Sequence, residues 1–152
     1  MVSQSWISME KQKKWFSEIK HDGSQLHFVI YYKNCAIGAA NIRSLDSSKL
    51  SNSMYIEPGI YIADPKYRGN ILAFGPSLLL IDYCFDELNA KALKAKVKKE
   101  NLAALKYNEK LGYEITAINN LTTIELGYKQ YQLATKTIKS FLSRTVNDRR
   151  TI

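Results

Sequence analysis

Apolar and polar positions follow helical spacing in some parts of this chain and strand spacing in others. Between Met9 and Lys20 apolar residues recur every three or four positions, which is typical of an amphipathic helix, and Asp22-Gly23 then gives a turn signal. Runs rich in β-branched and aromatic residues between turn residues predict strands. These runs cover residues 26–32, 35–43, 54–62, 91–97 and 113–118, with two further strands expected within 123–133.

Three later segments have helical character. Pro76 suits the first turn of a helix that continues to Leu88. Asn101 can cap a short helix that stops at Gly112. Apolar residues spaced through 138–146 predict a final helical tail.

The order of these elements indicates the fold class. It reads helix, hairpin, strand, helix, strand, helix, strand, strand, so helices do not alternate with every strand. A mixed α/β fold of the α+β type, with a largely antiparallel sheet, therefore fits better than a doubly wound fold. Pro58-Gly59 in the middle of one strand predicts a β-bulge. We assign residues 1–135 to one domain and residues 136–152 to a basic helical tail.

Composition supports one globular unit. The chain has 152 residues, of which 45% are apolar, with only seven glycines and three prolines. These values fit a single core and argue against disordered or low-complexity classes. The longest apolar stretch, residues 71–81, is interrupted by Gly75-Pro76 and falls short of the roughly 20 residues of a spanning helix. The N-terminus lacks the order of a secretory signal, so we expect a cytoplasmic protein.

Several kinds of site find little support. Cys35 and Cys84 have no CxxC spacing, so we expect two buried free thiols rather than a disulfide or zinc framework. His21 and His27 lack neighbouring ligand residues, and no metal is expected. No serine lies in a G-x-S-x-G pattern, which leaves no support for a serine hydrolase.

The net charge of +8 favours an anionic partner. Basic residues gather within 89–112 and 136–150. They fit either a solvated basic face or an anion site, and no helix-turn-helix, RNP-like or zinc-finger pattern accompanies them. Nucleic-acid binding is therefore the less favoured interpretation.

Two consecutive blocks carry the most specific pattern. They read EPGIYIADPKYRGNILAFGPSLLLIDYCFDEL and KALKAKVKKENLAALKYNEKLGYE. In order and spacing they resemble the GNAT acetyltransferase superfamily, and within it the branch of ribosomal-protein alanine acetyltransferases and amino-sugar acetyltransferases. The resemblance runs from Trp6 to about Leu133 and implies a mostly antiparallel central sheet flanked by helices. The family's first strand and helix would precede Trp6, so either the sequence starts late or this is a short member.

The first block resembles the family's acetyl-CoA loop, R/Q-x-x-G-x-G/A. Arg68 and Ala73 match it, whereas Ile71 stands where glycine is usual. Backbone N–H groups at a helix N-terminus suit a pyrophosphate, so with Ile71 the loop must use negative φ or rely on Gly69 and Gly75. A plain strand-to-helix turn is the alternative. The resemblance implies cofactor binding by Ile60, Tyr61, Ile62, Arg68, Gly69, Asn70, Ile71, Leu72, Ala73, Phe74, Gly75, Asn101 and Asn108.

The second block resembles the family's N-x-x-A/S followed by E-K-x-G-F/Y. The resemblance implies that Asn101 contacts the pantetheine arm or the helix start, and a plain N-cap is the alternative. Seven residues on, many members carry a tyrosine that protonates the departing thiolate, but this chain has Asn108, which can donate a hydrogen bond and is no useful proton source. Tyr107 lies about 100° round the helix and is assigned to the core or surface.

Glu57 matches a strand glutamate that many members place near the acceptor amine. An ammonium group has no lone pair with which to attack, so a proton must be removed, and a carboxylate can accept it. Glu57 and Asn108 are therefore the candidate catalytic residues. The alternative is that Glu57 faces solvent or pairs with a lysine.

The resemblance implies an N-acetyltransferase that moves an acetyl group from acetyl-CoA directly to a primary amine. An amino-sugar nucleotide, a protein N-terminus and a small amine all remain open as acceptors, as does a homodimer. No metal and no membrane partner are expected. The alternatives are a non-catalytic acyl-CoA-binding module and, less favoured, a basic nucleic-acid-binding protein.

Overall fold

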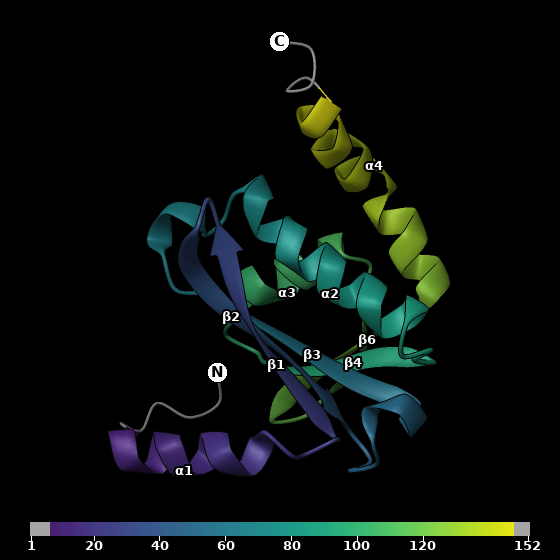
Figure 1. The fold of residues 1–152 in the computed structure, drawn as a ribbon. Coiled ribbons are helices and arrows are strands. Elements are labelled where there is room, and N and C mark those ends of the chain that lie inside the picture. Colours follow the sequence, from purple (N-terminus) through teal and green to yellow (C-terminus); the bar gives the residue numbers. More distant parts are fainter. Residues whose placement is uncertain (1–6, 148–152) are drawn as a thin grey trace.

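The computed structural model describes the backbone of residues 7–147 and the side chains of residues 7–143. Its helices are α1 (Met9–Ile19), α2 (Phe74–Asp86), α3 (Leu102–Lys110) and α4 (Tyr128–Asn147) (Figure 1). Its strands are β1 (Gln25–Tyr32), β2 (Cys35–Ser44), β3 (Tyr55–Ile62), β4 (Ala92–Lys98), β5 (Glu114–Ile118) and β6 (Leu121–Leu126). Up to residue 118, each predicted helix and strand is present within two residues of its expected bounds.

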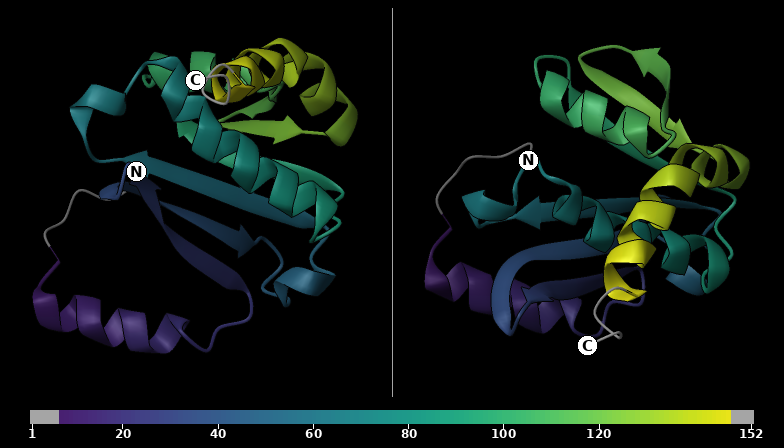
Figure 2. Two further views of the ribbon diagram at one scale, coloured as in Figure 1. Left: turned by 45° about the horizontal axis from the view of Figure 1, so that its top comes forward. Right: turned by 90° about the horizontal axis from the view of Figure 1, so that it is seen from above.

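The six strands form one sheet in the order β1-β2-β3-β4-β6-β5. All neighbours are antiparallel except β3 and β4, which run parallel and pair only at Tyr55 with Ala92 and at Ile56 with Leu93. The predicted α+β fold with a mostly antiparallel sheet is therefore confirmed. Beyond this short contact the two halves of the sheet separate (Figure 2).

The core lies between α2 and one face of the sheet. Ile42, Ile56 and Leu93 are fully buried there, against the α2 residues Ile81 and Cys84. Helix α1 lies on the opposite side of the first three strands (Figure 2). Its Trp15 ring meets the His27 ring of β1 edge-on, at 5.0 Å between centroids. The sheet therefore has a core face and a second, more open face.

The C-terminal part of the fold differs from the sequence prediction. The two strands expected within residues 123–133 are wrong, because a single strand, β6, is followed by Gly127 and then by α4. Tyr131 and Thr135, one turn apart, are both fully buried, and Ile138 packs against the core on the next turn. Helix α4 is continuous through residue 135, at which the sequence-based domain boundary was set.

The bulge predicted at Pro58-Gly59 is also wrong. Pairing between β2 and β3 runs from Gly38 with Ile62 to Ser44 with Ile56 without a shift of register. At Pro58 the other edge of β3 has already separated from β4. A proline is tolerated where a strand edge has no partner, because no hydrogen bond between strands is lost there when the N–H is missing.

One of the two thiol predictions is also wrong. Cys84 is a buried free thiol and burial raises its pKa to about 12, but Cys35 is exposed at the start of β2. Cys35 follows a two-residue hairpin turn, in which Lys33 and Asn34 have φ of 47° and 64°, and a strand end beside such a turn offers little cover. Within residues 7–147 no helix is long and apolar enough to cross a membrane, and no group of His, Cys, Asp or Glu could hold a metal ion.

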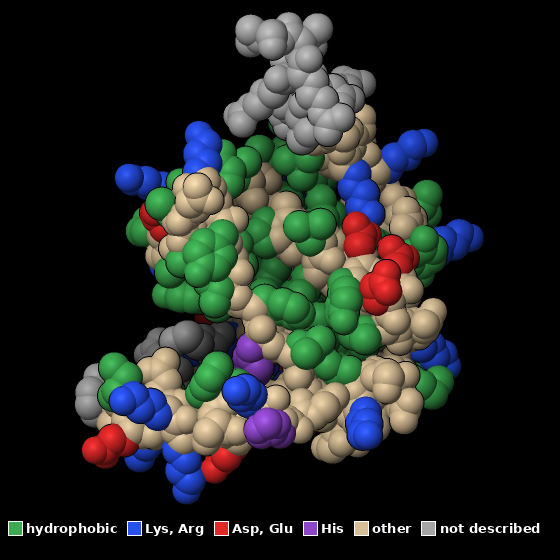
Figure 3. Space-filling model, in the orientation of Figure 1, with side chains coloured by type: hydrophobic (Ala, Val, Ile, Leu, Met, Phe, Trp, Pro, Cys, Tyr) green, Lys and Arg blue, Asp and Glu red, His purple; other side chains and the backbone are tan. Residues whose placement is uncertain are grey.

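Apolar side chains gather on one surface, over α2 and β1 (Figure 3). Leu79 is 74% exposed on α2, and Tyr83 meets Phe28 of β1 edge-on at 6.5 Å. Helix α4 covers another part of α2 through Tyr131. Helix α2 therefore packs on the sheet and on α4 and leaves a third side open.

Candidate functional site

The separation of β3 from β4 creates a cleft between two unpaired strand edges. Past Ile56 and Leu93 no pairing between these strands occurs in the described part of the chain. Between the two edges lies a partly open cavity of about 200 Å³, which α2 and α3 also line. Its lining residues are Pro58, Ile60, Ser77, Leu80, Ile81, Ala95, Ala104, Tyr107, Asn108, Leu111 and Tyr113. Main-chain groups of β3 and β4 thus face a cavity with mostly apolar walls.

The loop between β3 and α2 turns at Gly69. Its φ of +71° lies in the left-handed region, whereas Ile71 has no positive φ and Gly75 lies inside α2. Of the two glycines considered from the sequence, Gly69 and not Gly75 therefore provides the left-handed backbone conformation of the turn. Asn70 braces the turn, because its Oδ1 accepts from Leu72 N at 2.9 Å and its Nδ2 donates to Lys66 O at 2.9 Å.

Three successive loop amides remain open for a ligand. Within the described chain, the N–H groups of Gly69, Asn70 and Ile71 donate to no protein acceptor. They immediately precede α2, whose N-terminus carries the positive end of the helix dipole. Unpaired amides beside a helix N-terminus are suited to bind an anionic group.

Arg68 ties the loop to the end of β3. Its Nε donates to Ile62 O and its Nη2 to Ala63 O, both at 2.8 Å, and its guanidinium lies 5.9 Å from the Tyr61 ring centre. The side chain is therefore engaged with the main chain. Of the predicted pantetheine residues, Ile60 lines the cleft. Ile60 and Tyr61 both line a second cavity, which also includes His27.

The last loop residues lead into α2. Leu72 is exposed, Ala73 is buried, and Phe74 stacks on the Tyr107 ring at 4.6 Å between centroids. The Tyr107 hydroxyl donates to Ala73 O at 2.9 Å and lies 2.5 Å from Ser77 Oγ. Tyr107 therefore links α3 to the beginning of α2, a role that the sequence analysis missed because its partners lie 30 or more residues away.

The two asparagines of the second block bond to their own helix. Asn101 Oδ1 accepts from Ala104 N at 3.1 Å, so its side chain acts as the N-cap of α3. Asn108 Nδ2 donates to Ala104 O at 2.9 Å. Asn108 lines the cleft, and among the described residues its amide oxygen accepts no hydrogen bond.

Glu57 forms an ion pair with Arg43, which lies opposite it on β2. The Glu57 side chain is 18% exposed, and Arg43 Nε and Nη2 both donate to its Oε2. Residues alternate between sheet faces, so Glu57 lies on the face away from Ile56 and α2. The partner is thus an arginine, not one of the lysines considered from the sequence, and the Glu57 carboxylate lies beside the point where β3 and β4 separate.

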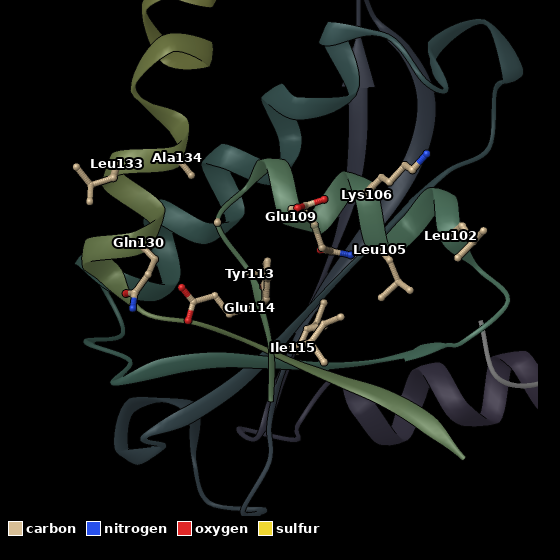
Figure 4. A pocket seen from close by; sticks show the side chains of 13 residues that line it. Leu102, Leu105, Lys106, Glu109, Tyr113, Glu114, Ile115, Gln130, Leu133 and Ala134 are labelled. Carbon is tan, nitrogen blue, oxygen red and sulfur yellow. The ribbon is translucent and has the colours of Figure 1, made fainter. Parts of the chain in front are cut away.

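A second, larger groove of about 690 Å³ lies between α3, β5 and α4 (Figure 4). The end of α3 approaches α4 closely, because a Cβ on Gly112 would lie 2.8 Å from Gln130 O. Leu102, Ile115 and Leu133 expose apolar surface at this groove. The sequence analysis missed the groove because it expected strand where α4 begins.

Comparison with known proteins identifies the family and the fold. The model of the acetyltransferase (GNAT) domain family matches residues 2–114, whereas no curated protein matches the chain. Among solved structures, Campylobacter jejuni N-acetyltransferase PseH in complex with acetyl coenzyme A is 21% identical, with a TM-score of 0.66 over 82% of this chain and 83% of PseH.

Two other solved structures have the same fold. Vibrio cholerae spermidine N-acetyltransferase in complex with CoA and spermine is 19% identical, with a TM-score of 0.71 over 85% of this chain and 80% of that one. An uncharacterized protein from Bacillus halodurans is 13% identical, with a TM-score of 0.74 over 88% of this chain and 75% of that one. Since the family model covers most of the sequence, the chain belongs to the GNAT acetyltransferase family.

Proposed function

We propose that this protein transfers an acetyl group from acetyl-CoA directly to a primary amine. The observation that carries the proposal is the separation of β3 from β4, which leaves two unpaired strand edges beside a cleft at the start of α2. An extended chain with alternating amides, such as the pantetheine arm, can use main-chain groups of this kind.

The geometry supports a set of donor-binding residues. The amides of Gly69, Asn70 and Ile71 would hold the pyrophosphate at the helix N-terminus. Main-chain groups of Ile60 and its neighbours along β3 would hold the pantetheine arm, and the amide oxygen of Asn108 offers an acceptor from the other wall. Acetyl-CoA supplies the activated thioester, so the protein need only bind, orient and move protons.

Glu57 would accept the proton of the amine. Its ion pair with Arg43 fixes the carboxylate beside the point where β3 and β4 separate, and both Arg43 donors use Oε2, which leaves Oε1 without that partner. The acceptor would approach from the sheet face opposite α2. A neutral amine can then attack the thioester carbon, the nitrogen gives a second proton to solvent as the amide forms, and the C–S bond breaks with the departure of CoA as a thiolate.

The leaving group needs no strong acid. Free thiols have a pKa of about 8.5, so a thiolate is a tolerable leaving group near neutral pH. Asn108 would contribute to donor binding and not to proton transfer.

The test separates binding from transfer. Calorimetric titration with CoA measures binding, and release of free CoA thiol from acetyl-CoA is followed with three amines: an amino-sugar nucleotide, a peptide with a free N-terminus, and spermidine. Binding together with thiol release that depends on one amine supports the proposal. Binding without release by any amine would favour the acyl-CoA-binding module, for which Asn108 in place of a tyrosine is the specific argument. Salt-sensitive DNA or RNA binding that excess CoA does not alter would instead favour the nucleic-acid interpretation.

A further inference from the structure

The open face of the first three strands places a row of side chains next to Glu57. Strand pairing aligns Arg43 of β2 with Glu57 of β3 and, two residues further along, Asn41 with Gly59. His27 of β1 pairs with Asn41 in turn. Because side chains alternate between the two faces of a sheet, all five positions lie on the face opposite α2. The row of His27, Asn41 and Gly59 is thus about 7 Å from Glu57 along β3.

The cavity that includes His27 lies over this second row. It measures about 300 Å³, and we call it the open-face cavity. Gly59 leaves room for the Asn41 side chain, because a Cβ on Gly59 would lie 2.4 Å from Asn41 Oδ1. Helix α1 lies on this side of the strands, where Trp15 meets His27 edge-on (Figure 2). The lining residues are His27, Ala39, Ala40, Asn41, Gly59, Ile60 and Tyr61.

The side-chain amide of Asn41 is free to bind a ligand. Within the described residues it makes no hydrogen bond, whereas the His27 ring is engaged with Gln25 Oε1 at 3.0 Å. Every fully enclosed side-chain polar atom in that part of the chain has a partner, so the Asn41 amide is accessible from outside the protein. An amide of this kind can both donate to and accept from a hydroxyl group.

The charges around the open-face cavity do not suit a second ammonium group. None of its lining residues, all within the described chain, is acidic, and the neighbouring Glu57 is already paired with Arg43. Asp22 lines the next hollow, where its Oδ1 accepts from Ser24 and its Oδ2 from Gln25. A polyamine carries a second ammonium a few carbons from the reacting amine, and removal of that charge from water without a carboxylate partner is unfavourable. The cavity therefore disfavours polyamines.

Main-chain groups are not available on this face either. Strand β2 pairs with β1 on one edge and with β3 on the other, so its main chain is engaged on both sides. Extended peptides are commonly recognised through free main-chain groups of a strand. The cavity instead offers the Asn41 amide and the rings of His27 and Tyr61. Such groups suit a ligand ring that has hydroxyl groups at its edge and apolar CH groups on its face.

We propose that the acceptor amine is carried on a sugar ring, and that Asn41 selects this acceptor by a hydrogen bond to a ring hydroxyl. This inference rests on the acetyl transfer proposed above. With the amine at Glu57, a sugar ring extends along β3 toward the second row and brings a hydroxyl to Asn41. Asn41 determines specificity and takes no part in bond making or proton transfer.

The test compares ring amines with and without hydroxyl groups. Release of free CoA thiol from acetyl-CoA is followed with glucosamine, a nucleotide-linked amino sugar and cyclohexylamine. Asn41→Ala should lower kcat/KM for the preferred amino sugar about fivefold to tenfold, the effect of one lost hydrogen bond, and leave kcat/KM for cyclohexylamine within twofold of wild type. Because each amine is compared with itself, differences in amine pKa cancel. Asn119→Ala, which changes an exposed asparagine in the turn between β5 and β6, is the matched control and should alter neither value.

A second variant tests the charge argument. Asn41→Asp keeps the shape of the side chain and adds a carboxylate in the row next to Glu57. We expect kcat/KM for spermidine to rise about tenfold and that for the amino sugar to fall, because the second ammonium then has a partner. Thermal melting shows whether each variant is folded.

The outcomes separate this inference from the proposed function. A wild-type preference for an amino sugar over spermidine and over a peptide with a free N-terminus, reduced in Asn41→Ala, supports the acceptor assignment. Faster release with spermidine or the peptide, or an equal loss for the amino sugar and cyclohexylamine in folded Asn41→Ala, would overturn that assignment and leave acetyl transfer intact. CoA binding without thiol release by any of these amines would overturn both proposals.

Discussion

Replacement of Gly69 by valine should weaken CoA binding without unfolding the protein. Gly69 has φ of +71°, and a Cβ placed on it would meet no atom within 4 Å. The substitution therefore introduces no clash, and its whole effect comes from the backbone conformation. Valine is β-branched and strongly disfavours this region, so the loop should shift toward negative φ and redirect the open amides that follow.

The size of the effect follows from the conformational penalty. A non-glycine residue in the left-handed region costs roughly 1–2 kcal/mol. If binding requires the observed loop conformation, this cost appears in the affinity, and about 1.4 kcal/mol corresponds to a tenfold change in Kd. We therefore expect the Kd of CoA to rise about 5- to 30-fold.

Gly75→Ala is the matched control. A Cβ on Gly75 would likewise meet no atom within 4 Å, but Gly75 lies inside α2 and lacks a positive φ. Alanine there should leave CoA affinity unchanged and stabilise the protein by about 0.4–1 kcal/mol. Calorimetric titration with CoA and thermal melting of both variants provide the comparison. A Gly69→Val protein that is folded and binds CoA within twofold of wild type would refute the assignment of this loop.

Three further substitutions test other parts of the molecule. Glu57→Gln should lower kcat/KM by about 10²-fold, and the wild-type rate should rise between pH 6 and 9 as the amine loses its proton. An unimpaired Glu57→Gln variant would show that another group accepts the amine proton. Asn108→Ala should raise the Kd of CoA several-fold and change kcat little, and steady-state kinetics showing the reverse would contradict this. Tyr131→Phe removes a hydroxyl that donates to Asp82 Oδ1 at 2.7 Å. We expect the free energy of unfolding to fall by about 1.5 kcal/mol and the Tm by about 3–6 °C, and an unchanged Tm would contradict this expectation.

Local sequence signals predicted most of the elements correctly. The hairpin of β1 and β2 follows from two aromatic or β-branched runs around Lys33-Asn34, and both residues of that turn do adopt positive φ. The short helix α3 follows from Asn101 as its N-cap and Gly112 as its C-terminal stop. In each case the residues that determine the element lie within a few positions of one another, so the local sequence is enough to predict it.

The start of α4 could not be predicted in the same way. The segment from Tyr128 to Leu133 alternates apolar and polar residues enough to resemble a strand. Its helical state is stabilised by tertiary contacts, since Tyr131 packs on Phe85 at 5.9 Å and bonds to Asp82 of α2. Packing against a distant helix thus overrides the local pattern, which is a known limit of propensity arguments.

The same distinction applies to the candidate site. Sequence motifs located the loop around Gly69 and the strand that carries Glu57, but the partners of the side chains depend on residues far along the chain. Arg43 and Glu57 are 14 residues apart, and Ser77 and Tyr107 are 30 apart. Such contacts follow from the register of the sheet and from helix packing, so they can be identified only once the fold is known.

These long-range contacts hold in place the loop that we propose to bind the donor. Helix α2 is held near its beginning by the Tyr107 hydroxyl and along its length by α4, where Lys139 Nζ and the Tyr131 hydroxyl both bond to Asp82 Oδ1 at 2.7 Å. A helix fixed at two places presents its N-terminus, and the open amides before it, in a fixed position relative to β3. We therefore expect main-chain groups to supply most of the donor binding and Asn108 to add a weaker contact, so that Asn108 in place of a tyrosine is compatible with binding of the donor.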